Sequence, residues 1–139
     1  MADRAVASFD YVALPTGKPE EMIAFYGALG FSVPDIEQWR AAGVPFFSIQ
    51  FGSQKINVHA PELWLRDNFT LRGPTAKPGC GDLCFVWEGG AERLRETLAA
   101  AHAEIIAGPI ELPGARGKGV SVYVRDPDAN LLEFIIYEE

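Results

Sequence analysis

The last strand-like segment of the chain, "NLLEFIIYEE", places one carboxylate among residues that are typical of a buried strand. Glu133 stands between Leu132 and Phe134, and a carboxylate is costly to remove from water unless another group compensates its charge. Two interpretations fit such a residue. Glu133 is either a metal ligand or general base in a functional site, or a structural carboxylate paired with a neighbouring group.

Other polar residues fall on the same side of the predicted strands as Glu133. Side chains alternate between the two faces of a strand, so residues two apart share a face. By this rule four more residues lie on the face that carries Glu133: Tyr11, Asn57, His59 and Asp82. All four are residue types that bind metals or polar ligands. If the sheet curves, these side chains converge at one site. The alternative is an ordinary solvated face of an antiparallel sheet.

Three of these residues also have a purely structural interpretation. Asp82 is either a ligand or a residue that caps the backbone after Gly81, and His59 is either functional or a solvent-facing residue at a strand end. Tyr11 is either a hydrogen-bond donor of the site or a residue that fills space. The opposite face of the same strands is uniformly apolar and is predicted to pack against helices; it holds Val12, Leu14, Ile56, Val58, Leu83, Phe85, Trp87, Leu132, Phe134 and Ile136.

Two stretches of the chain show the same order of predicted elements, and these elements must position the polar residues. The evidence is the alternation of apolar residues, their helical spacing, and Gly and Pro at the ends of segments. In the first stretch these signals predict a strand over 9–14, a helix over 19–30, and strands over 31–33, 46–51 and 54–59, with a turn at 52–53. After a Pro- and Gly-rich segment over 73–81, the second stretch predicts a strand over 81–89, a helix over 90–105 and strands over 105–106, 119–126 and 131–138. The repeat predicts an α+β fold of two βαβββ modules.

Length and composition limit the classes of protein that fit. The 139 residues suit one domain over 1–139, made of a module over 8–60, a linker over 61–80 and a module over 81–139. The net charge of −7, without a basic run, argues against nucleic acid and anionic membranes as partners. No membrane span or signal peptide is expected, and Cys80 and Cys84 are expected to be free thiols in a reducing cytoplasm.

Several motifs, taken in order, resemble a known superfamily. The paired modules with "FDYVAL", "AFYGALGF", "FGSQKINVH", "PGCGDLCF" and "RDPDANLLEF" look like the vicinal oxygen chelate superfamily, which includes glyoxalase I, bleomycin and fosfomycin resistance proteins and extradiol dioxygenases. The glyoxalase-domain subgroup resembles them most. The resemblance covers about 9–137 and implies a curved, cup-like, mostly antiparallel sheet with helices on its outer face. It also implies a homodimer.

The resemblance implies a divalent metal in the cup, with ligands from the first and last strands of each module. The matching residues are Asp82, Glu133 and His59, whereas Tyr11 and Asp82 stand at first-strand positions that often hold His. These two departures argue against extradiol dioxygenase chemistry, which uses two histidines and a carboxylate. The oxygen-rich set favours Mg²⁺, Mn²⁺ or Ca²⁺ over ions that prefer thiolate or imidazole ligands. The ions expected as candidates are Mg²⁺, Mn²⁺, Ni²⁺ and Zn²⁺. No nucleotide cofactor is expected.

Two functions follow from the resemblance. The first is a glyoxalase-like, metal-dependent lyase or isomerase that moves a proton on a small oxygen-rich substrate through Glu133 and His59. The alternative is a non-catalytic protein that binds or sequesters a small molecule, as bleomycin resistance proteins do. The substrate-binding residues are expected to be Tyr11, Asn57, Arg116 and Lys118, the last two from a Gly-rich loop that lacks the order of a phosphate-binding loop and is otherwise a hairpin connector.

The "RDPDAN" motif has a structural role in this interpretation, because its turn aims the last strand and therefore Glu133. The subgroup usually has glycine where this chain has Ala129. Alanine there either adopts a left-handed backbone conformation, in which it is strained, or implies another type of turn.

Overall fold

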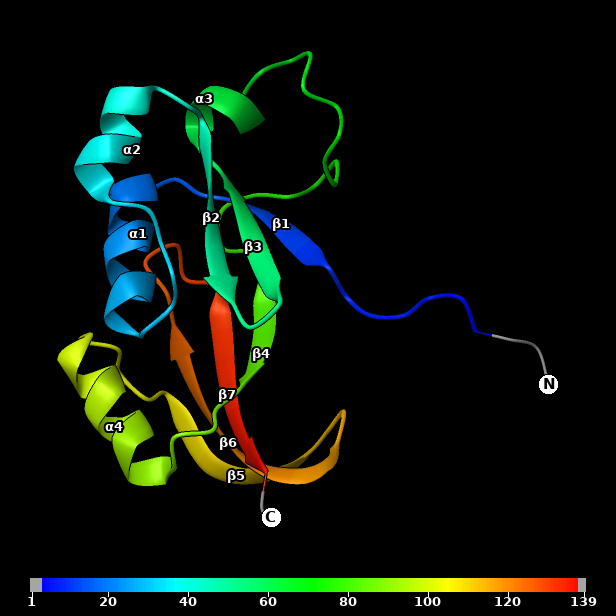
Figure 1. The fold of residues 1–139 in the computed structure, drawn as a ribbon, viewed down its shortest axis with the longest axis vertical. Helices are drawn as coiled ribbons and strands as arrows, with labels where there is room; N and C mark the ends of the chain where they lie inside the picture. The colour runs from blue at the N-terminus through cyan, green and yellow to red at the C-terminus, as the bar shows by residue number, and fades with distance from the viewer. Residues whose placement is uncertain (1–3, 138–139) are drawn as a thin grey trace.

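The structure, a computed structural model, describes residues 4–137, in which two modules each begin with a strand and a helix and end with paired strands (Figure 1). The first module contains β1 (Tyr11–Pro15), α1 (Pro19–Ala28), α2 (Ile36–Ala42), β2 (Phe46–Phe51) and β3 (Gln54–His59). After α3 (Pro61–Trp64), the second contains β4 (Asp82–Val86), α4 (Ala91–Ala100), β5 (Ala107–Gly114), β6 (Gly117–Arg125) and β7 (Leu131–Tyr137). The predicted α+β class of two βαβββ modules is confirmed, although residues 1–3 and 138–139 of the predicted domain lie outside the described part.

The two sheets share one topology. The first has the strand order β1-β3-β2 and the second the order β4-β7-β6-β5. In each sheet the first strand of the module pairs in parallel with the last strand, and the remaining pairs are antiparallel. The first and last strands of each module therefore lie side by side, which places the polar residues of those strands close together.

Three predicted elements differ from the observed ones. The strand over 31–33 is reduced to one bridge between Ser32 and Gln50, because Pro34 follows at once and has no N–H to continue a ladder. The helix predicted over 90–105 ends at Ala100, and the short strand predicted over 105–106 is wrong, since β5 begins at Ala107. Helix α2 was not predicted, although Asp35 caps its start by accepting the Gln38 N–H at 2.9 Å.

The apolar face predicted from strand alternation is confirmed. Each of its ten residues is buried in the core or packs against it, and helices α1 and α4 cover the core with Met22, Ile23, Leu94 and Leu98. An aromatic cluster links the modules, because the ring of Phe85 on β4 lies 5.0 Å from Phe31 and 5.2 Å from Phe51, centroid to centroid. Both modules therefore share one core, and no helix within residues 4–137 is long and apolar enough to cross a membrane.

A buried polar network also ties helix α1 to the turn before β7. The Tyr26 hydroxyl donates to Asp126 at 2.7 Å, and the Asn130 amide donates to the same carboxylate at 2.8 Å. From the loop after β1, the Thr16 hydroxyl donates to Asp128 at 2.5 Å. The "RDPDAN" turn is thus fixed from both modules, and Ala129 within it has φ +71°, the strained conformation expected there.

Candidate functional site

The carboxylate of Glu133 lies on the face of the second sheet that points away from the core. On β7, Glu133 stands between its register partners Cys84 on β4 and Tyr123 on β6. The Ser121 hydroxyl donates to Glu133 Oε2 at 2.6 Å. The charge of Glu133 also acts on Cys84 and Tyr123, its neighbours on the two adjacent strands. Glu133 is therefore surrounded by two hydroxyls and a thiol, all of which are proton donors.

The thiol of Cys84 is held in its protonated form. Partial loss of its water and the charges of Glu133 and Asp82 raise the pKa of Cys84 to about 12. The pKa of the Tyr123 hydroxyl is raised by loss of water and by the neighbouring charge of Glu133. At neutral pH both groups keep their protons, so they act as hydrogen-bond donors and Cys84 is not a thiolate ligand.

Asp82 lies on the same face of the sheet, at the exposed start of β4. The backbone after the linker is capped by another residue, since Asn130 Oδ1 accepts the Gly81 N–H at 2.7 Å. Within residues 4–137 the Asp82 side chain has no hydrogen bond or ion pair. Its charge acts on Cys84, so Asp82 adds negative charge beside the group around Glu133.

The candidate residues of the first module form a second group on β1 and β3. Tyr11 is 48% exposed, and the Lys55 ammonium lies 5.5 Å from its ring centroid. Asn57 is half-buried and accepts a hydrogen bond from the Ser48 hydroxyl at 3.1 Å. His59, two residues further on, shares their face.

His59 is a neutral base in this setting. Its ring packs edge-on against Phe69, 5.3 Å between centroids. Partial burial and the nearby charge of Arg72 lower the pKa of His59 below its usual value of 6.5. The imidazole therefore carries a free lone pair at neutral pH, which suits a proton acceptor or a metal ligand.

Arg116 and Lys118 differ in their surroundings. Lys118 pairs with Glu111 at 3.7 Å, and both side chains are well exposed. The Arg116 guanidinium lies 5.6 Å from the ring centroid of Tyr137, and the backbone N–H of Arg116 donates to the Tyr137 hydroxyl at 3.3 Å. Tyr137 shares the face of Glu133 on β7, so Arg116 is the better placed of the two to meet an anionic substrate.

The polar residues thus form two groups, one on each sheet. The first-sheet group is Tyr11, Asn57 and His59; the second-sheet group is Asp82, Cys84, Ser121, Tyr123 and Glu133. No hydrogen bond or ion pair joins the two groups in the described residues. Nor does any set of three His, Cys, Asp or Glu side chains within residues 4–137 come together as a metal site.

This arrangement decides how a metal fits the chain. Catalytic metals are held by at least three protein ligands in most sites. The second-sheet group offers two carboxylates and a protonated thiol, and His59 belongs to the other sheet. One chain alone therefore does not fit a metal at these residues, and the set Asp82, Glu133 and His59 requires a further source of ligands.

Sequence reasoning missed Ser121 and Tyr123. Both lie on β6 opposite the buried Val122 and Val124, so alternation in "GVSVYVRD" places them together on one face. Their contact with Glu133 depends on the β6–β7 register, which pairs Tyr123 with Glu133. Register follows from the folded sheet, and the alternation within one strand does not reveal it.

Known proteins similar to this chain share most of its length. No model of a protein family matches it. The chain is 34% identical over 135 residues to the glyoxalase domain-containing protein RDO1 of Mycosarcoma maydis, covering 97% of this chain and 71% of that protein. It is 35% identical over 129 residues to virulence protein STM3117 of Salmonella typhimurium, covering 92% of this chain and 83% of that protein.

Solved structures agree with these relatives. The crystal structure of virulence protein STM3117 superposes with a TM-score of 0.81 at 32% identity, over 97% of this chain and all 100% of that one. An integron cassette protein of Vibrio cholerae superposes with a TM-score of 0.81 at 27% identity, over 99% and 100% of the two chains. The whole two-module architecture is therefore shared.

Proposed function

Since the chain belongs to the glyoxalase-domain proteins of the vicinal oxygen chelate superfamily, we propose that it is a lyase or isomerase that moves a proton on a small oxygen-rich substrate. The observation that carries the proposal is the surrounding of Glu133. Its carboxylate accepts a 2.6 Å hydrogen bond from Ser121 and has the protonated Tyr123 and Cys84 beside it on the adjacent strands. A base flanked by proton donors is what proton transfer next to a carbonyl requires.

The residues divide the reaction between them. Glu133 takes a proton from the carbon next to a carbonyl, and negative charge then develops on the carbonyl oxygen. The Tyr123 hydroxyl, whose raised pKa keeps it protonated, donates a hydrogen bond to that oxygen. Arg116, stacked on Tyr137, neutralises an anionic part of the substrate.

A second copy of the chain completes the site in this proposal. The first-sheet group and the second-sheet group each lie on an open face, and β1 and β4 each have a single neighbouring strand among those described. Joining β1 of one copy to β4 of another would bring His59, Asn57 and Tyr11 in front of Glu133. The neutral imidazole of His59 then serves as the second proton carrier.

The same assembly would also provide enough ligands for a divalent metal. Asp82 and Glu133 from one copy and His59 from the other would supply three ligands, which one chain does not. None of the proton transfers assigned above depends on that metal. Elemental analysis measures the metal content of the wild-type dimer and of the Glu133→Ala variant. About one equivalent of metal in the wild type that is lost in the variant supports a site made of Asp82, Glu133 and the His59 of the other copy.

The decisive experiment is isotope exchange. Candidate 2-oxoaldehyde adducts and epimerisable acyl compounds are incubated with the protein in D₂O, and loss of the proton next to the carbonyl is followed by NMR. Glu133→Gln keeps the shape and removes the base, so exchange is expected to fall by about 10²–10⁴-fold. Glu111→Gln, on an exposed carboxylate of β5, is the matched control and is expected to exchange at the wild-type rate.

Equal exchange rates in Glu133→Gln and wild type, with both proteins folded by circular dichroism, would refute the proposal. The runner-up is a protein that binds a small molecule without turnover. It is favoured by one specific observation: Tyr11, at a first-strand position that often holds a histidine, has the Lys55 ammonium over its ring. Native mass spectrometry that finds a retained organic molecule, with no exchange on any candidate, supports the runner-up instead.

A further inference from the structure

The linker between α3 and β4 brings an arginine to the first-sheet group. The ring of Phe69, from the loop that is green beyond α3 in Figure 1, packs edge-on against His59 at 5.3 Å between centroids. Arg72 follows three residues later, and its positive charge acts on His59. The loop therefore places a guanidinium beside the imidazole that is the candidate proton carrier of this group.

Several contacts hold Arg72 in one orientation. Its guanidinium carbon lies 5.8 Å from the ring centroid of Trp64, a distance at which a cation is attracted to an aromatic face. The same guanidinium donates to the Ala76 carbonyl, and the backbone N–H of Arg72 donates to the Thr70 carbonyl at 2.9 Å. Trp64 is itself fixed, because its indole N–H donates to the Thr16 carbonyl at 2.9 Å. The arginine is thus oriented before any ligand binds.

The charge of Arg72 has no acidic partner within residues 4–137. The ion pairs in this part of the chain join Arg40 to Glu20 and Lys118 to Glu111. Arg72 is nonetheless half-buried, whereas every other arginine of these residues is exposed. A guanidinium has five N–H donors, and a hydrogen bond to one carbonyl leaves most of them free. A partly desolvated cation without a counter-charge is unfavourable, and a bound anion would remove that cost.

We propose that Arg72 is a further binding residue of the site and holds an oxyanion group of the substrate, a carboxylate or a phosphate, beside His59. The planar guanidinium can donate to two oxygens of either group at once. In the assembly of two copies, Arg72 would arrive together with His59 in front of Glu133, where Arg116 supplies a second cation. The inference rests on the function proposed above for its statement that the anion belongs to the substrate. It narrows the substrate to a small molecule that carries an oxyanion.

The three tryptophans of the chain provide a reporter and its controls in one ¹H–¹⁵N correlation spectrum. Trp64 is the reporter, because Arg72 lies over its ring. All three indole N–H groups donate to a backbone carbonyl at 2.9 Å, which makes them comparable: Trp39 to Phe46, Trp64 to Thr16 and Trp87 to Gly90. The probes are pyruvate, which carries a carboxylate, and inorganic phosphate. Each is titrated into the full chain at constant pH and ionic strength.

At least one probe is expected to shift the Trp64 signal saturably, while the Trp87 signal stays in place. Arg72→Gln is expected to weaken binding of that probe by about tenfold or more, the factor that one charge-assisted hydrogen bond contributes. Arg72→Lys keeps the charge without the planar fork and is expected to bind the probe with intermediate affinity. Unchanged Trp87 signals in the absence of probe show that both variants are folded.

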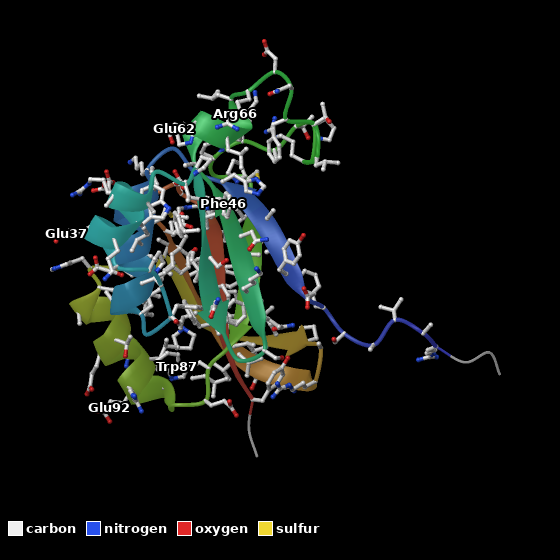
Figure 2. The ribbon with its side chains drawn as sticks, turned by 45° about the horizontal axis from the view of Figure 1, so that its top comes forward. Glu37, Phe46, Glu62, Arg66, Trp87 and Glu92 are labelled. Carbon is white, nitrogen blue, oxygen red and sulfur yellow. The ribbon has the colours of Figure 1, made fainter. Side chains whose placement is uncertain are left out.

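Arg66→Gln is the matched control from the same linker. Arg66 is exposed and lines a separate hollow toward α2 together with Trp39 and Glu62 (Figure 2). Arg66→Gln is therefore expected to bind the probe as the parent does. The Trp39 signal reports on this second arginine, so a probe that binds arginines indiscriminately would move the signals of Trp39 and Trp64 alike.

Three outcomes would overturn the inference. The first is a parent whose Trp64 signal shows no saturable shift with either probe. The second is equal affinity in the parent, Arg72→Gln and Arg72→Lys, which would mean that the arginine only covers the Trp64 ring. The third is an equal response of Trp39 and Trp64, which would mean that the anions bind exposed arginines in general.

A saturable Trp64 shift that is lost in Arg72→Gln supports the inference, and the responding probe distinguishes a carboxylate from a phosphate ligand. The titration needs neither turnover nor the second copy, so its result is separate from that of the isotope-exchange experiment. An oxyanion site at Arg72 in a protein that exchanges no proton would refute the proposed lyase or isomerase and leave the binding site standing.

Discussion

Replacing Tyr26 with phenylalanine tests the network that joins the two modules. Tyr26 is fully buried and its hydroxyl donates to Asp126, which is 6% exposed, at 2.7 Å. The same carboxylate also accepts the Asn130 amide at 2.8 Å and the N–H groups of Asp128 and Asn130 at 3.0 Å. Tyr26→Phe therefore removes one of four donors and leaves the carboxylate partly satisfied.

The expected cost follows from these contacts. A hydrogen bond to a charged group contributes about 1.5–3 kcal/mol, and the three remaining donors keep the loss near the middle of that range. We expect Tyr26→Phe to lower the free energy of unfolding by about 2 kcal/mol. With an unfolding entropy of about 2.1 cal/mol/K per residue, this corresponds to a fall in Tm of about 7 °C.

The cost should also depend on pH. Burial raises the pKa of Asp126 above its usual value of 3.8, against the lowering effect of its hydrogen bonds to Asn130 and Tyr26. A carboxyl with a raised pKa in the folded state binds more protons folded than unfolded, so its contribution to stability declines as pH rises through that pKa. Loss of the Tyr26 donor raises this pKa further. The destabilisation is therefore expected to be larger at pH 7 than at pH 4.

Urea unfolding, followed by tryptophan fluorescence at one protein concentration and at both pH values, measures these free energies. Tyr11→Phe is the control, because Tyr11 is 48% exposed and its loss is expected to cost less than about 0.5 kcal/mol. A Tyr26→Phe protein as stable as the control, or one whose cost grows on acidification, would contradict the assignment of this network.

Three further predictions concern single residues. Ala129→Gly is expected to stabilise the fold by about 0.5–1 kcal/mol in urea unfolding, because alanine is strained at φ +71°; Ala99→Gly, in helix α4, should instead destabilise it by about 1 kcal/mol. Alkylation of Cys84 should stay slow until pH approaches its pKa of about 12, and Glu133→Gln should speed it at pH 8 by removing a neighbouring charge. In an NMR titration His59 should lose its proton below pH 6.5, because burial and a nearby cation lower its pKa; a midpoint above 6.5 would remove it as a neutral base.

The sequence by itself determined the modules and the two faces of their strands. Alternation of apolar residues is a local property, so it assigned Leu132 and Phe134 to the core and Glu133 to the opposite face. The strained position of Ala129 was indicated by the resemblance, because the subgroup usually has glycine there. Helix α2 was missed because none of its residues is buried, and a helix without an apolar stripe has no periodic signal.

Only the tertiary structure decided which polar residues meet. The placement of Ser121 and Tyr123 beside Glu133 depends on the register between β6 and β7, and the lowered pKa of His59 depends on its burial and on Arg72 from the linker. The separation of the first-sheet and second-sheet groups likewise depends on how two sheets pack around one core. Each of these facts arises between segments far apart in the chain, where packing and hydrogen bonding of the whole fold set the geometry.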